Sequence, residues 1–390
     1  MSTDAVVVGG GLIGLASAWR AAEAGMRVTL VDPAPATAAS QVAAGMLAPV
    51  GEVDYGERDL LRLNIASSER WPAFADDLER ASGADPGYRQ TGTLLVGFDD
   101  DDARVLEDMH RFREALDLRV ERLSSRRCRS QEPALSPRVR TGLAAPDDHQ
   151  ADPRQVLDAL QSAVAAGGVE HRPEPVARID HDGGRVTGVT TEGGAQLSAP
   201  WVVLAAGAAS ADIGGLPPEV SPPVRPVKGQ LLRLRHRGGD PVLSGVVRGI
   251  VGGRRAYLVP RGDGRLVVGA TQEEVGADTT VTAGAMRTLL DDATRLVPEV
   301  DELELTDALA GLRPGTPDNR PLIGRTDLDG LVLATGHHRN GVLLTPITAE
   351  AVAAIMTGGP LDPVLSVADP ARPAAQAPAR PSTPHAEAAT

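Results

Sequence analysis

Three glycines near the start of the chain have the spacing of a dinucleotide-binding turn. Gly9, Gly11 and Gly14 form the pattern GxGxxG, and Asp32 follows at the end of the next apolar run. Gly9 permits a tight turn, Gly11 lets the backbone approach a pyrophosphate, and Gly14 lets helix and strand pack closely. The free N–H groups at the helix start would bind the phosphates, and Asp32 would accept hydrogen bonds from the adenosine ribose. The pattern predicts a dinucleotide site and leaves both NAD and FAD open.

A second group of polar residues lies between two glycines near the other end of the chain. His337, His338, Arg339 and Asn340 lie in the turn Thr335–Gly341, which follows the apolar strand Leu331–Ala334 and precedes a helical segment. A helix N-terminus aimed at the pyrimidine edge of a flavin would stabilise negative charge on the reduced ring. The alternative is an ordinary turn between strand and helix.

The elements that must position these residues follow from hydrophobic periodicity. Ala5–Val8, Leu15–Ala24 and Arg27–Val31 predict a βαβ unit around the glycines. Trp201–Ala206 is fully apolar, which is typical of a strand covered on both faces. A three-stranded meander is predicted over 176–197, an N-capped helix after Asp152-Pro153, further helices over 64–81, 105–116, 282–296 and 349–356, and a separate antiparallel sheet over 224–269. We interpret the acidic tract 99–102 as a solvated turn.

Composition narrows the class of partner. The formal net charge is −13, which disfavours nucleic acid and anionic lipid, and aromatic residues make up only 2%. The single cysteine, Cys128, forms no internal disulfide, and the histidines show no metal-ligand spacing, so no metal site is expected. Without an apolar span or a leader-like start, the chain is expected to be cytoplasmic and to act on a small molecule.

Several longer motifs carry a family resemblance. They are VVVGGGLIGLASAW at the start, SQVAAGMLAP from Ser40, RPVKGQ from Arg225, AYLVPRGDGRLVVGATQE from Ala256, GLRPGTPDNRPLIG from Gly311 and ATGHHRNGVLLTPITAE from Ala334. Over about residues 4–358 the chain resembles the D-amino acid oxidase family of FAD-dependent amine oxidases, and within it the glycine oxidases of the thiamine pathway. The first motif is generic to dinucleotide folds, whereas the last two are specific to this family.

The resemblance implies noncovalent FAD. Related sarcosine oxidases tether their flavin through a cysteine near the segment matching 311–313, and this chain has no cysteine there. The implied and predicted cofactor-binding residues are Gly9, Gly11, Ile13, Gly14, Asp32, Pro33, Ser40, Gln41, Gly45, Met46, Leu47, Val176, Gly207, His337, His338, Arg339, Asn340, Gly341, Val342 and Leu343.

The same resemblance implies a substrate site built on two arginines and a tyrosine. A guanidinium fork matches a carboxylate and does not titrate away, and Arg313 and Arg339 lie in segments that resemble the substrate-facing ones. Tyr257 resembles the tyrosine whose hydroxyl faces the same pocket. These three residues are the predicted catalytic and substrate-binding set, although either arginine could instead pair with Asp318 or with flavin oxygens. The role of Lys228 and the effect of Arg255, two residues before Tyr257, stay open.

The family implies hydride transfer from the Cα of the neutral amine to flavin, hydrolysis of the imine and reoxidation by oxygen to hydrogen peroxide. The expected reaction is oxidative deamination of glycine, or of sarcosine and small D-amino acids, with glycine imine supplied for the thiazole of thiamine. A D-amino acid or sarcosine dehydrogenase with another electron acceptor stays an alternative, as does a flavin-binding redox sensor without turnover. Relatives suggest a homo-oligomer, with a homotetramer as the expected state.

The predicted fold class is α/β plus α+β, with a Rossmann-like FAD-binding domain and a discontinuous antiparallel-sheet substrate domain. At 390 residues the chain exceeds the usual size of a single core. We assign 1–82, 146–215 and 310–365 to the FAD-binding domain, and 83–145 and 216–309 to the substrate domain. Residues 366–390, rich in Ala and Pro without periodicity, are predicted to be a disordered tail.

Overall fold

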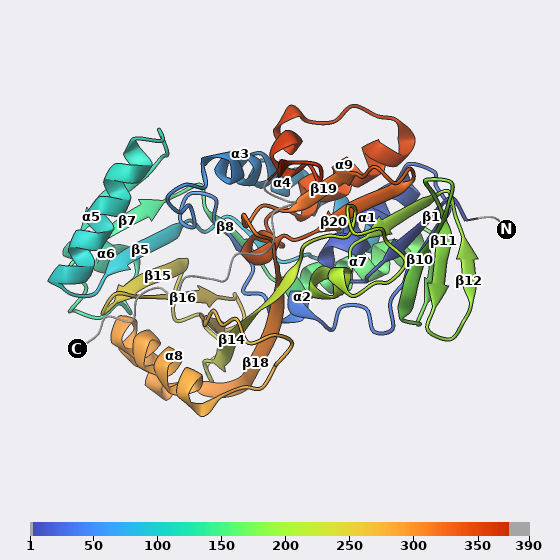
Figure 1. The fold of residues 1–390 in the computed structure, drawn as a ribbon. Helices are drawn as coiled ribbons and strands as arrows, with labels where there is room; N and C mark the ends of the chain where they lie inside the picture. Colours follow the sequence, from blue (N-terminus) through green and yellow to red (C-terminus); the bar gives the residue numbers. More distant parts are fainter. Residues whose placement is uncertain (1–2, 374–390) are drawn as a thin grey trace.

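A six-stranded sheet forms the centre of one half of the molecule (Figure 1). The computed structural model describes residues 3–373. The strand order is β19-β20-β13-β1-β2-β9, with only β19 antiparallel to its neighbour. The strands are β1 (Ala5–Val8), β2 (Val28–Val31), β9 (Glu170–Arg172), β13 (Trp201–Leu204), β19 (Leu322–Arg325) and β20 (Leu331–Thr335).

Alternate residues of this sheet pack on two different layers. Ala5 and Val7 face helices α1 (Leu12–Glu23), α4 (Trp71–Ser82), α7 (Pro153–Ala166) and α9 (Thr345–Thr357). Val6 and Val8 face the small sheet of β10 (Val176–Asp182), β11 (Arg185–Thr191) and β12 (Gln196–Ser198). Because both faces are covered, the central strands are apolar throughout, as predicted for 201–206. The meander and the N-capped helix after Asp152 are also confirmed.

The other half is built on an eight-stranded sheet, with order β18-β14-β17-β16-β15-β5-β7-β6. All neighbours are antiparallel except β15 and β5, which are parallel. The strands are β5 (Thr93–Gly97), β6 (Glu121–Ser124), β7 (Thr141–Ala145), β14 (Arg225–Arg235), β15 (Val246–Val251), β16 (Arg254–Pro260), β17 (Arg265–Gly269) and β18 (Glu304–Gly315). One face packs on α8 (Ala283–Leu296), and α5 (Asp100–Glu114) packs on the opposite face.

Short elements connect the two halves. A three-stranded sheet contains β3 (Met46–Leu47), β8 (His149–Ala151) and β4 (Tyr88–Arg89). The remaining helices are α2 (Ala39–Val42), α3 (Arg58–Ser68) and α6 (Ser125–Gln131), with 3₁₀ turns η1 (Gly207–Ala211), η2 (Pro298–Glu302), η3 (His338–Asn340) and η4 (Pro363–Ala368).

The acidic tract 99–102 is not a solvated turn, and that interpretation was wrong. Asp99 caps α5 by accepting from the N–H groups of Asp101 and Asp102, and the next three aspartates form the first helical turn. Acidic residues are favoured there by the helix dipole. Asp102 is buried, and its carboxylate accepts hydrogen bonds from the N–H groups of Gly252 and Gly253 at 3.0 and 2.9 Å.

The predicted boundaries of the two domains and of the tail differ from the observed elements at three places. Strand β18 continues to Gly315, past the predicted boundary at 310, and β4 pairs with β8 instead of joining the large sheet. The start of the predicted tail is ordered, because η4 packs against the body and Arg372 forks onto Asp318 with two bonds of 2.9 Å. Residues 374–390 of that predicted tail lie outside the described residues.

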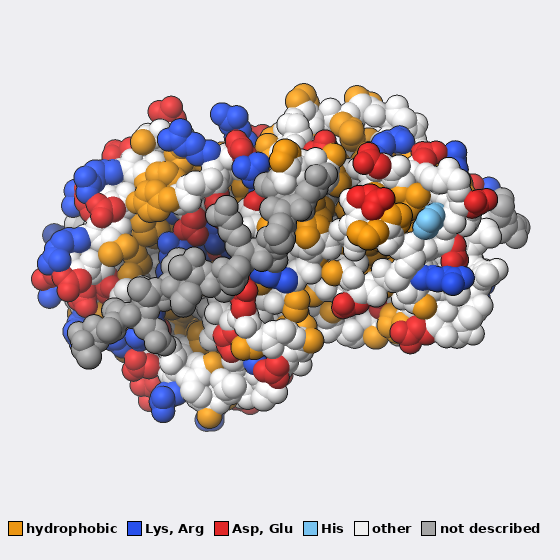
Figure 2. Space-filling view, in the orientation of Figure 1, with side chains coloured by type: hydrophobic (Ala, Val, Ile, Leu, Met, Phe, Trp, Pro, Cys, Tyr) orange, Lys and Arg blue, Asp and Glu red, His pale blue; other side chains and the backbone are white. Residues whose placement is uncertain are grey.

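The surface carries both signs of charge. On the face drawn in Figure 2, basic and acidic side chains are interspersed and no broad area of one sign is visible. In the described part of the chain, no helix is long and apolar enough to cross a membrane.

Candidate active site

The glycine turn adopts the geometry that its spacing predicts. Gly9 has a φ of +106°, and a Cβ there would lie 2.5 Å from the carbonyl oxygen of Ala205. A Cβ on Gly14 would lie 1.8 Å from the carbonyl oxygen of Gly9, so only glycine allows α1 to approach β1 this closely. Helix α1 begins at Leu12 without a side-chain cap from Gly11. Apart from the N–H of Leu12, which donates to Ser40, the first N–H groups of α1 are open to an anion.

Asp32 holds the same turn from the end of β2. Its carboxylate accepts from the N–H of Gly10 at 2.6 Å and from the N–H of Ala34 at 2.7 Å. Pro33 follows at the exposed end of the strand. Each carboxylate oxygen has a second lone pair, so Asp32 keeps acceptor capacity for a ribose hydroxyl.

The predicted cofactor segment 40–47 passes directly over this turn. The hydroxyl of Ser40 accepts from the N–H of Leu12 at 3.2 Å. Gly45 has a φ of +77°, and a Cβ there would lie 1.9 Å from the carbonyl oxygen of Ala151. Met46 and Leu47 then pair with β8. Val176 begins β10, and Gly207 begins η1 after the apolar strand β13.

The turn 335–345 brings the predicted histidines into the interior. Nε2 of His337 lies 3.0 Å from Oγ1 of Thr348, and burial lowers the pKa of His337 to about 3. Burial, together with nearby arginines, also lowers the pKa of His338 to about 3. Both imidazoles are therefore neutral at physiological pH and are buried, not exposed. Asn340 is buried, and its Oδ1 has no hydrogen-bond partner within the described residues.

Glutamine at position 337 tests this burial through stability. In the unfolded chain His337 takes up a proton below about pH 6.5, whereas in the folded protein it stays neutral down to about pH 3. Lowering the pH from about 6.5 to about 3 therefore favours the unfolded state and decreases the free energy of unfolding. We expect the unfolding free energy of His337→Gln, measured in urea, to depend on pH less steeply than that of wild type between pH 6 and 4. The difference should approach about 1.4 kcal/mol per pH unit. Identical slopes would contradict a buried neutral imidazole.

Arg313 and Tyr257 are brought together on one face of the large sheet. Tyr257 lies on β16 opposite Gly269, where a Cβ would collide with the phenol ring. Arg313 lies on β18, and its guanidinium covers Gly229 of the neighbouring strand β14. Burial raises the pKa of Tyr257, and the adjacent Arg313 partly offsets this rise, so the phenol keeps its proton.

Among the described residues, Arg313 has no carboxylate partner. Its Nη1 donates only to the main-chain oxygens of Thr271 and Lys228, at 3.2 and 3.4 Å. A half-buried cation with main-chain acceptors alone is suited to bind an incoming carboxylate. This pair of residues is the arrangement predicted for the substrate.

Arg339 is placed differently from the predicted second clamp. Its guanidinium pairs with Asp54 at 3.0 Å and with Glu57, both from the segment between β3 and α3. Arg339 does not pair with Asp318, because Asp318 binds Arg372 instead. The guanidinium of Arg339 is not free either, since Asp54 and Glu57 both hold it. Although burial opposes ionisation, Arg339 and Arg255 lower the pKa of Asp54. Of Arg313 and Arg339, Arg313 alone therefore lacks a carboxylate partner among the described residues.

The two residues with open roles are also placed. The side chain of Lys228 lies on the α8 face of β14, opposite to Arg313, and its Nζ pairs with Asp278 at 2.8 Å. A structural role fits this position. Arg255 is exposed and pairs with Asp54 at 2.8 Å.

Sequence reasoning missed a group of charges beside Tyr257. Arg248 is the register partner of Tyr257 on β15 and pairs with Glu52. Asp148 is fully buried and accepts from the N–H groups of Val50 and Gly51, and burial raises its pKa to about 7. An arginine inside the apolar run VVRGIV was the one available sign of Arg248.

Alanine at position 229 tests the placement of Arg313 without removing its charge. The new Cβ would lie 2.3 Å from the guanidinium, so the flexible side chain must move. We expect KM for the amino-acid substrate to rise about 10- to 100-fold, the range that a misplacement of about 1 Å produces. Bound FAD should be unchanged. Gly262→Ala, in the open turn between β16 and β17, is the control, and an unaltered KM in Gly229→Ala would contradict this placement.

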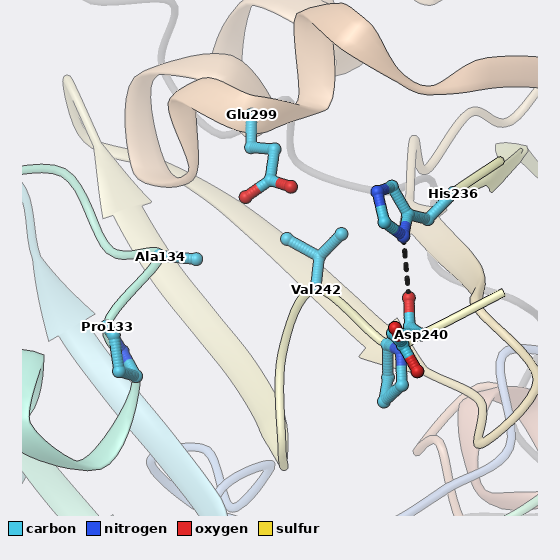
Figure 3. A pocket seen from close by; sticks show the side chains of 7 residues that line it. Pro133, Ala134, His236, Asp240, Val242 and Glu299 are labelled. Atoms are coloured by element: carbon cyan, nitrogen blue, oxygen red, sulfur yellow. Dashed lines mark hydrogen bonds between the residues drawn. The ribbon is translucent and has the colours of Figure 1, made fainter. Parts of the chain in front are cut away.

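A surface cavity of about 390 Å³ lies elsewhere on the large sheet (Figure 3). His236, Asp240 and Glu299 line it, and Nδ1 of His236 lies 3.0 Å from the main-chain oxygen of Asp240. It adjoins the far end of β14, seven residues from Gly229, or about 23 Å along an extended strand. This cavity is not the Arg313 site.

Comparison with known proteins places the chain in a family. A family model described as FAD dependent oxidoreductase (DAO) matches residues 4–355. The chain belongs to this family. The glycine cradle, the start of α1 and the Oδ1 of Asn340, which has no partner among the described residues, fit the FAD that the family requires.

Individual relatives are similar over nearly the whole chain. The bifunctional protein ThiO/ThiG of Synechocystis sp. is 35% identical over 374 residues, 95% of this chain and 54% of the relative. The chain thus spans about half the length of that relative. The glycine oxidase of Geobacillus kaustophilus is 32% identical, covering 90% of this chain and 92% of the relative. The crystal structure of glycine oxidase from Geobacillus kaustophilus superposes with a TM-score of 0.85 at 30% identity, over 94% of this chain and 98% of that one.

Proposed function

We propose that the protein oxidises glycine, with sarcosine and small D-amino acids as secondary substrates. The observation that carries the proposal is the guanidinium of Arg313, which has no carboxylate partner among the described residues and lies beside the protonated hydroxyl of Tyr257. The similar proteins named glycine oxidase support the choice of substrate.

In this proposal the chain's own groups bind and orient the amino acid. Arg313 holds the carboxylate, and Tyr257 donates its hydroxyl proton to the same group. Val42, Met46 and Leu309 pack, like Tyr257, against one small buried cluster, and we propose that this apolar surface favours a substrate without a large side chain on Cα. FAD, when bound, would supply the two-electron acceptor that oxygen can reoxidise.

The proposed reaction balances without a further cofactor. Glycine loses a hydride from Cα and a proton from nitrogen, and water hydrolyses the resulting imine to glyoxylate and ammonia. Oxygen takes up the two electrons and two protons as hydrogen peroxide. Because of the ThiO/ThiG relative, we further propose that glycine imine feeds the thiazole of thiamine. No side chain is assigned as a general base, since the two histidines of the turn are buried and neutral.

A peroxide-coupled screen of the purified flavoprotein against small amines and amino acids tests the proposal. We expect the highest kcat/KM for glycine or sarcosine. Flavin that substrate reduces anaerobically should reoxidise quickly when air is admitted. Reduced flavin that persists in air would identify a dehydrogenase instead, and flavin that no amino acid reduces would identify a sensor.

A further inference from the structure

The segment 39–46 is held from the large sheet by two buried arginines. Arg233 lies on β14, and its Nη2 donates to the main-chain oxygen of Gln41. Arg261 follows directly after β16, and its Nη2 donates to the main-chain oxygen of Ala44 at 2.6 Å. Their side chains are only 7% exposed each, although both are cations.

These main-chain oxygens are ones that the local helix cannot satisfy. Helix α2 has only four residues, Ala39–Val42, and the last carbonyls of a helix have no intrahelical donor. A cation is also favoured at this end of a helix. The two guanidinium groups therefore complete α2 and fix the chain that leaves it.

The same segment lies against the site predicted for the cofactor. Ser40 binds the N–H of Leu12 at the start of α1, and Gly45 is pressed against the main chain of Ala151. We propose that Arg233 and Arg261 are positioning residues for FAD, which hold segment 39–46 in its cofactor-binding conformation. Each acts through a main-chain oxygen of this segment.

The bonding of Arg261 depends on its fork shape. One terminal nitrogen, Nη1, donates to Oε1 of Gln150, while Nη2 reaches Ala44, and Nε lies 3.7 Å from Asp152. Lysine keeps the charge but places a single nitrogen at the end of the side chain. Arg261→Lys therefore loses part of this set without burying an uncompensated carboxylate.

Arg261 directly follows the strand that carries Tyr257. Tyr257 precedes Arg261 by four residues, about 13 Å along an extended chain. Strand β16 thus fixes the position of the Tyr257 hydroxyl relative to segment 39–46. The inference itself concerns FAD alone, so it stands whether or not glycine is the substrate.

Titration of the apoprotein with FAD, followed by flavin fluorescence, tests the inference. We expect the Kd for FAD to rise about 10-fold or more in Arg261→Lys and in Arg233→Lys, the equivalent of about one charge-assisted hydrogen bond. Amide hydrogen exchange of the apoprotein should become faster in the peptide covering 39–47. Arg265→Lys is the matched control, because Arg265 pairs with Asp152 and Asp263 and does not contact segment 39–46. Its Kd should stay within about twofold of wild type.

Two results would overturn the inference. A lower unfolding temperature with a wild-type Kd and unchanged exchange in 39–47 would show that the arginines only stabilise the fold. An increase in Kd as large in Arg265→Lys would show a general effect of charge. If one of the two arginine variants does not fold, the other decides, since each guanidinium holds a different carbonyl of the segment.

Discussion

Replacing Arg313 with methionine should lower kcat/KM for glycine by about two to three orders of magnitude while FAD stays bound. This is the usual range when one partner of a close charge pair is lost. Among the described residues, Arg313 has only main-chain acceptors. The group that loses its partner in Arg313→Met is therefore the carboxylate of the substrate. Steady-state kinetics by peroxide release measures kcat/KM, and the flavin spectrum measures the bound FAD.

The matched control is Arg235→Met, at the exposed end of β14. It removes the same charge from the same sheet without reaching Tyr257 or Gly229, and should keep wild-type kinetics. If Arg313→Met kept the wild-type KM and kcat, the carboxylate would have to bind elsewhere. Arg339→Ala should raise KM less than Arg313→Met, because Arg339 already has carboxylate partners in Asp54 and Glu57.

Replacing Gly14 with alanine should abolish FAD binding at micromolar cofactor. The new methyl would lie 1.8 Å from the carbonyl oxygen of Gly9, which is main chain and cannot move aside without opening the βαβ turn. We expect the Kd for FAD to rise about 100-fold or more, since about 2.7 kcal/mol is enough for that change. The purified protein should be colourless.

Ala18→Gly separates this effect from ordinary loss of helix stability. Ala18 is buried in the same helix, and glycine there costs about 1 kcal/mol without adding an atom near Gly9. Its unfolding temperature should fall while its affinity for FAD is kept. A Gly14→Ala protein that binds FAD normally would falsify the close-packing role of Gly14.

The cofactor turn could be predicted from sequence because its determinants are local. Gly9, Gly14 and Asp32 act within one βαβ unit, so their spacing along the chain already contains the geometry. The apolar strand Trp201–Leu204 was equally readable, since a strand covered on both faces leaves a continuous hydrophobic run.

The substrate site could not be derived in the same way. The approach of Arg313 to Tyr257 depends on strand register across β18, β14, β17 and β16, and no pattern within a single strand specifies register between strands. The family resemblance pointed to both residues, whereas Arg248 had no motif to mark it. The pairing of Arg339 with Asp54 and Glu57 comes from an irregular segment without periodicity.

The acidic tract shows a different kind of error. Asp99 with Asp102 three residues later is a capping pattern, and the high local charge obscured it. Burial of Asp102 then depends on Gly252 and Gly253, about 150 residues away in sequence, which no local pattern indicates.

The order of strands in the six-stranded sheet has a consequence for synthesis on the ribosome. The glycine turn leaves the ribosome before its neighbours β13 and β20 and the turn before Thr345, which are made much later. At about 5–20 residues per second, the nascent chain waits tens of seconds before the cofactor cradle is complete. Until β13 is made, β1 lacks that neighbour, and the cofactor cradle is complete only after the segment up to Thr345 has left the ribosome.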